Sequence, residues 1–173
     1  RKKKKKLTLI FFIFLNTHTH TTQGFTVPNL SCFELEKKFE IPVIGSDLSA
    51  ITYDPETGKF FAVNNGAATI HELSCDWSLA IPCTQDRYWN MTIPSIGIED
   101  PEGISSMGSR KFAITDENPS LVRTMTLNID GTVSNVEIVS RVLDTPAGAN
   151  KGYEGVAWIN SKFYVAQESG PVA

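Results

Sequence analysis

The feature that most constrains this chain is an internal repeat with a period of just over 50 residues. Each repeat has a strand of small residues, a short turn, and a second strand in which Phe is followed two positions later by Val or Ile. The first strands align at Ile51, Ile104 and Val156, which are 53 and then 52 residues apart. The second strands align at Phe61, Phe112 and Phe163. A fixed period of this length indicates structural units that stack on their neighbours.

Within each repeat the residue pattern predicts β-strands. Alternation in residues 59–66 places Phe61 and Val63 on one face of a strand and Ala62 and Asn64 on the other. Gly and Pro mark the turn before it, at residues 54–58. Third strands are predicted at residues 69–73 and 121–127, and fourth strands at 88–93 and 134–142, with a hairpin turn at 128–132.

Four short strands in a unit of about 50 residues are typical of a propeller blade. We therefore expect an all-β fold, a partial β-propeller of about three four-stranded blades, with repeat units near 46–98, 99–150 and 151–173 in a domain spanning 25–173. A β-sandwich of ordinary hairpins is the alternative, and the fixed period argues against it. Since such rings close with about four to eight blades, we read the chain as a fragment of a ring, six-bladed by expectation.

The first 24 residues have the layout of an export signal. Arg1 to Lys6 are all basic, and the nine mostly apolar residues that follow rise only about 14 Å as a helix, too short for a bilayer core of about 30 Å. This order predicts a signal peptide, or alternatively an uncleaved N-terminal anchor, in residues 1–24. We expect a secreted or cell-envelope protein. If it is anchored in the plasma membrane, we expect the contact with the membrane only through this segment.

Charge excludes one class of partner. Beyond the basic run, the chain carries ten basic and nineteen acidic residues. Nucleic-acid binding requires a basic face that neutralises phosphates, so we expect no nucleic-acid partner.

The cysteines and two short motifs agree with export. Cys75 and Cys83 flank a short segment, and the sequence predicts a disulfide between them, leaving Cys32 free or bonded elsewhere. The triplets that begin at Asn29 and Asn90 fit the pattern of N-glycosylation acceptors.

Several segments resemble the SdiA-regulated, YjiK-like family. The resemblance runs from Ser46 to about Glu168 and rests on residues 46–58, 100–104, 114–117 and 150–157, which read SDLSAITYDPETG, DPEGI, ITDE and NKGYEGVA. It implies a six-bladed, NHL-like propeller that is exported or membrane-anchored. It implies little about biochemistry, although the related esterase-like domain of phytase shares the Glu-Gly style of blade.

Acidic residues recur at equivalent places in the repeats. Glu102 and Glu154 begin the first strand of their units, while Glu117 and Glu168 follow the second strand. Because the first strand of a blade runs beside the central channel, these carboxylates, with Asp116, are candidate ligands for a molecule or a metal. Calcium is the expected cation, since it takes six to eight oxygens. Further oxygens nearby in the sequence belong to Asp100, Asn65 and Asn118.

Two functions and a structural alternative follow. We expect a ligand- or protein-binding module, not an enzyme, with a small molecule or protein bound at the acidic channel face. The alternative is a calcium-dependent hydrolase of esterase, lactonase or phytase type, with the same glutamates as metal ligands. A structural role is also open, in which Glu before Gly hydrogen-bonds backbone amides of the neighbouring blade. No catalytic residue is identified, because the chain has no Gly-x-Ser-x-Gly nucleophile motif.

Overall fold

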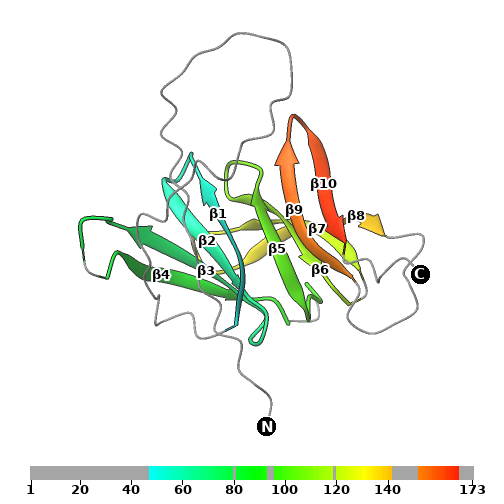
Figure 1. Ribbon diagram of the computed structural model, residues 1–173, viewed down its shortest axis with the longest axis horizontal. Helices are drawn as coiled ribbons and strands as arrows, with labels where there is room; N and C mark the ends of the chain where they lie inside the picture. The colour runs from blue at the N-terminus through cyan, green and yellow to red at the C-terminus, as the bar shows by residue number, and fades with distance from the viewer. Residues whose placement is uncertain (1–46, 80, 93–95, 119, 142–151, 168–173) are drawn as a thin grey trace, which may run out of the picture. The chain divides into compact units, whose positions relative to one another are not determined.

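The computed structural model describes residues 47–79, 81–92, 96–118, 120–141 and 152–167, all within one compact unit of the chain. These residues form ten strands in three antiparallel sheets, which confirms the all-β prediction (Figure 1). The described part includes no helix with the length and hydropathy needed to span a bilayer. The expected export segment, Asn29, Cys32 and Glu168 lie outside the described residues.

Blade one is a four-stranded sheet with the strand order β1-β2-β3-β4. Its strands are β1 (Leu48–Asp54), β2 (Lys59–Asn64), β3 (Thr69–Cys75) and β4 (Cys83–Asn90). The prediction for the last strand, residues 88–93, was wrong in its bounds. Cys83 pairs with Cys75 in register, and the confirmed disulfide joins these same two residues, so the hairpin extends further than its alternating residues suggest.

Blade two repeats this order with β5 (Pro101–Ser106), β6 (Lys111–Asp116), β7 (Leu121–Leu127) and β8 (Val133–Arg141). The predicted hairpin turn at 128–132 is confirmed, because the Asn128 amide donates to the Thr132 carbonyl at 2.9 Å and Gly131 adopts a φ of 86°. Glycine reaches this left-handed conformation without the Cβ clash that other residues suffer.

The third repeat contributes a two-stranded sheet, β9 (Tyr153–Ile159) and β10 (Lys162–Gln167). The first strands of the three sheets, β1, β5 and β9, lie next to one another in succession (Figure 1). This is the arrangement of innermost strands in a propeller, and it brings the starts of the three repeats together.

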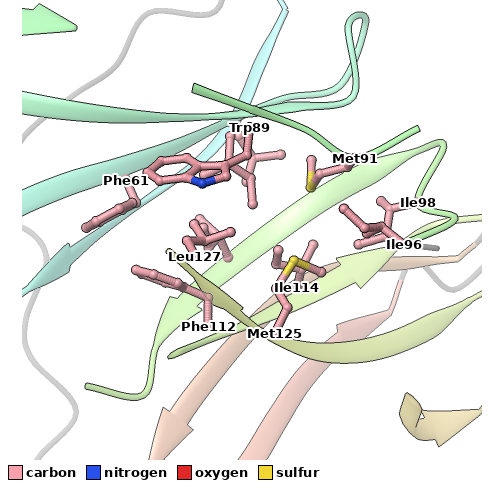
Figure 2. Close-up of a cluster of buried hydrophobic side chains, with 12 residues drawn as sticks. Phe61, Trp89, Met91, Ile96, Ile98, Phe112, Ile114, Met125 and Leu127 are labelled. Atoms are coloured by element: carbon pink, nitrogen blue, oxygen red, sulfur yellow. The ribbon is translucent and has the colours of Figure 1, made fainter. Parts of the chain in front are cut away.

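One hydrophobic core fills the space between blades one and two. Alternate residues of the strands face it, as the period of two in a strand requires. Phe61 and Phe112, equivalent in the repeat, meet there with ring centroids 4.4 Å apart. Figure 2 shows the converging side chains, which include Trp89, Met91, Ile96, Ile98, Ile114, Met125 and Leu127. Blades one and two therefore share one core, to which equivalent residues of the repeat contribute from both sides.

A buried ion-pair network also joins these two blades. Glu72 on β3 is only 1% exposed at its side chain, and its carboxylate accepts from Arg110, in the β5–β6 turn, at 2.5 Å. Arg87 on β4 reaches the other carboxylate oxygen at 2.8 Å. The Arg110 guanidinium lies 5.7 Å from the centre of the Phe61 ring. Ion pairs and apolar packing thus both hold blade one against blade two.

Candidate functional site

The first strand of every repeat contains a β-bulge at the same place. Register shifts leave one extra residue between Leu48 and Ala50 of β1, between Pro101 and Gly103 of β5, and between Tyr153 and Gly155 of β9. The extra residues are Ser49, Glu102 and Glu154. A bulge bends the strand and redirects the side chain of the extra residue. The backbone therefore treats these three positions as equivalent, as their spacing in the sequence predicts.

Glu102 contacts the preceding blade through two side chains. The Asn65 amide donates a hydrogen bond to Glu102 Oε1, and Ser49 also hydrogen-bonds the Glu102 carboxyl. Asn65 directly follows β2, and Ser49 is the bulge residue of β1. These contacts give Glu102 a part in joining blades, the role that the structural alternative expected. The partners of the Glu102 carboxyl here are side chains, whereas that alternative expected backbone amides.

Three carboxylates gather at this end of blade two. Single oxygens of Asp100, Glu102 and Glu117 all lie within 4.8 Å of one another. The backbone sets this arrangement: the Glu117 amide donates to the Asp100 carbonyl at 2.8 Å, so the residue after β6 is held beside the residue before β5. We name Asp100, Glu102 and Glu117 the acidic cluster. Oxygen donors at this spacing are the kind that hard cations prefer.

Two members of the acidic cluster, Glu102 and Glu117, hold their protons more tightly than free carboxyl groups do. Burial, and then the negative charges of Asp100, Glu154 and Glu117, raise the pKa of Glu102 to about 7, against the lowering effect of its Ser49 hydrogen bond. Burial is also the main cause that raises the pKa of Glu117. Negative charge is therefore unfavourable here, and a bound proton or cation relieves it.

The other predicted ligands, Asp116 and Glu154, are not among the residues of the acidic cluster. Asp116 is fully buried, and its Oδ1 accepts from the Asp100 amide at 3.1 Å, while its Oδ2 faces Arg123 Nε at 3.9 Å. The structure thus does not place Asp116 within the acidic cluster. Glu154 is exposed on β9, and its charge contributes to the raised pKa values of Glu102 and Glu117. Its assignment as a ligand remains a prediction.

The sequence suggested Asp100 only as a further oxygen donor, whereas in the structure it supplies one of the three oxygens of the acidic cluster. The bonds of Ser49 and Asn65 to Glu102 were missed altogether. Ser49 lies 53 residues before Glu102, at the equivalent place in the first repeat, which is the one signal in the sequence that connects them. Asn118, predicted as a further oxygen donor, is exposed in the turn after Glu117.

His71 is engaged in the structure of blade one. Its Nδ1 donates to Gln85 Oε1 at 2.6 Å, and its Nε2 accepts from the Thr69 hydroxyl at 2.8 Å. Burial lowers the pKa of His71 below its usual value. Both ring nitrogens therefore have structural partners within blade one.

The raised pKa of Glu102 predicts a pH dependence of stability. Between the usual glutamate pKa of 4.5 and about 7, folded Glu102 keeps a proton that the unfolded chain releases, so stability falls as pH rises. In urea unfolding, we expect the wild-type chain to lose about 1 kcal/mol more than Glu102→Gln between about pH 5 and about pH 8, a value reduced for the partial exposure of the carboxyl. Glu137→Gln, an exposed carboxylate on β8, is the control and should follow the wild type. Parallel pH profiles for wild type and Glu102→Gln would contradict the raised pKa.

Comparison with known proteins agrees with the geometry. A family model described as SdiA-regulated matches residues 29–173, which include all ten described strands and the whole acidic cluster. The match covers far more than half of the chain. The matched range includes the three successive sheets and the recurring Glu-Gly at the start of β5 and β9. The chain is a member of the SdiA-regulated family.

Proposed function

We propose that this protein is an extracytoplasmic binding module that takes a ligand or protein partner at the end of the sheets where the acidic cluster lies. The observation that carries the proposal is the grouping of Asp100, Glu102 and Glu117 within 4.8 Å, beside the innermost strands. Three carboxylates at this spacing repel one another when charged. This repulsion makes folding less favourable unless a bound proton or cation compensates the charge. Perturbed groups of this kind concentrate at functional sites.

Calcium is the proposed cation. The acidic cluster supplies three carboxylates, and the Asn65 side chain lies against Glu102 with an amide oxygen of its own. Calcium accepts carboxylate, amide and water oxygens in flexible geometry, so a partly built oxygen site can be completed by a ligand or by water. A cation held here would present a positive charge to an anionic group of the ligand.

The extracytoplasmic location is supported by the Cys75–Cys83 disulfide. Such bonds form and persist in oxidising compartments and are rare in reducing ones. The basic and apolar N-terminal residues point the same way.

Isothermal calorimetry with calcium tests the proposal. We expect saturable binding to the wild-type chain at about pH 7.5, weakened about tenfold or more in Glu102→Gln and in Asp100→Asn, since each removes a charged oxygen. Glu137→Gln is the matched control, because it removes an equal charge from the exposed face of β8. Equal binding by all variants would mean that calcium associates with the general acidic surface. Ester hydrolysis by the same calcium-loaded samples would test the hydrolase alternative, which stays a prediction.

A further inference from the structure

A second place on blade one has the geometry of a modification site. Asn90 ends β4, the outermost strand of the sheet, and is followed by Met91 and Thr92. Within β4, exposed residues alternate with more buried ones. Trp89 and Met91 are at most 1% exposed and belong to the core between the blades, while Tyr88 is 60% exposed and Asn90 is exposed as well. The strand thus anchors its inward residues and presents Asn90 to solvent.

The three residues from Asn90 to Thr92 are locally organised. Asn90 Oδ1 accepts a hydrogen bond from the Thr92 amide at 2.9 Å and another from the Thr92 hydroxyl at 2.8 Å. This turn sets the hydroxyl of the third residue beside the side-chain amide of the first. Hydrogen bonds to an amide oxygen draw electron density from the amide nitrogen and make its N–H more acidic. The turn therefore prepares Asn90 Nδ2 for loss of a proton during substitution.

We propose that Asn90 is an N-glycosylation site when the chain enters a secretory pathway that carries polyprenyl-diphosphate oligosaccharides. In the reaction, Asn90 Nδ2 forms a bond to C1 of the first sugar, and the bond between C1 and the diphosphate oxygen breaks. The polyprenyl diphosphate leaves with the electron pair, and the amide gives up one proton. The Asn90-Met91-Thr92 triplet satisfies the acceptor pattern, whose middle position excludes proline.

The sheet register shows where the glycan would be carried. Leu48 pairs with Asn64, Asn64 with Thr69, and Thr69 with Asn90, so these four residues form one row across blade one. The row begins next to Ser49, the bulge residue that bonds Glu102. At roughly 4.8 Å between neighbouring strands, Asn90 stands roughly 14 Å from the first strand. A glycan there lies at the outer rim of the same end as the acidic cluster and covers an edge strand that could otherwise pair with other chains.

The experiment is translation of the full chain behind a cleavable signal peptide in the presence of endoplasmic-reticulum microsomes. All samples carry Asn29→Gln, because Asn29 begins a second acceptor triplet. We expect one mobility shift, reversed by peptide N-glycosidase, which converts the modified Asn90 to Asp for detection by peptide mass spectrometry. Asn90→Gln and Thr92→Ala should both lose the shift completely.

A matched control lies in the turn after β6. Asn118 is exposed like Asn90 and begins the triplet Asn118-Pro119-Ser120, whose central proline blocks acceptance, so Asn118→Gln should leave the shift unchanged. The added signal peptide supplies entry, so failure of the exported location proposed above is distinguishable from failure of the site. No shift in the Asn29→Gln chain, with a known glycoprotein modified in the same reaction, would overturn the proposal. A shift that persists in Asn90→Gln would do the same.

Discussion

Replacement of Glu72 by Ala is expected to destabilise the protein by about 3–5 kcal/mol, because it leaves the largely buried Arg110 and the partly exposed Arg87 without their carboxylate. Glu72 is 1% exposed and pairs with Arg110 at 2.5 Å and with Arg87 at 2.8 Å. The Arg110 side chain is only 15% exposed, so water cannot fully replace the lost partner. The free energy of unfolding, measured by urea denaturation followed by tryptophan fluorescence, is the quantity to compare, since Trp89 lies in the adjoining core.

The second blade suggests the control for this substitution. Glu72 pairs in register with Phe61, and the equivalent partner of Phe112 is Met125, which is fully buried. Apolar residues thus suit this position when no arginine faces it. The combined change of Glu72→Met and Arg110→Met should therefore cost less than Glu72→Ala alone, since the more buried arginine is removed with its partner and the remaining Arg87 side chain is 32% exposed, where water can solvate it. A loss of under about 1 kcal/mol for Glu72→Ala would show that the ion pairs are solvated and contribute as surface pairs do.

Replacement of Gly103 by Ala is expected to destabilise the protein by about 2–3 kcal/mol through a clash between blades two and three. A Cβ at Gly103 would lie 2.5 Å from Thr115 Oγ1, 2.8 Å from Gly155 Cα and 2.9 Å from Val156 N. Two of these atoms are backbone atoms of β9, which cannot move aside without shifting the strand. Urea denaturation measures the loss, and amide hydrogen exchange in β9 should rise because its contact with β5 is loosened.

The equivalent glycine in the next repeat is the matched control. A Cβ at Gly155 would meet only Ala166 Cβ, at an ordinary contact distance of 3.8 Å among the described residues. Gly155→Ala should therefore change stability by less than about 1 kcal/mol. Equal losses at the two glycines would indicate a general cost in the first strand, and close approach of the blades would then not be the cause.

The two glycines also show which of their properties follow from the local sequence and which depend on tertiary contacts. Both belong to the same Glu-Gly pattern and both follow a bulge residue. The sequence therefore predicts their equivalence, and the register agrees. Only the packing of β5 against β9 shows that Gly103 has no room for a side chain. Contacts between blades depend on residues about 50 positions apart, which no local pattern reports.

The acidic cluster, too, was predicted from the sequence only in part. Repeat alignment singled out Glu102 and Glu117, and the structure brings both into one cluster. The same reasoning included Asp116, which the structure directs to Arg123 and to the Asp100 amide. Neighbouring residues on a strand point to opposite faces, and a turn or bulge at the strand end decides which one reaches the cluster. A sequence pattern identifies the carboxylates but does not orient them.

The amino-acid sequence by itself determined the repeat, the strands of blade two, the disulfide between Cys75 and Cys83, and the family. These properties depend on alternation, turn residues and spacing along the chain, which are local. The tertiary structure decided the early start of β4, the bulges at Ser49, Glu102 and Glu154, and the joining of blades through Glu72. These depend on which strand edges and side chains meet after folding, because register and burial are set by partners distant in the sequence.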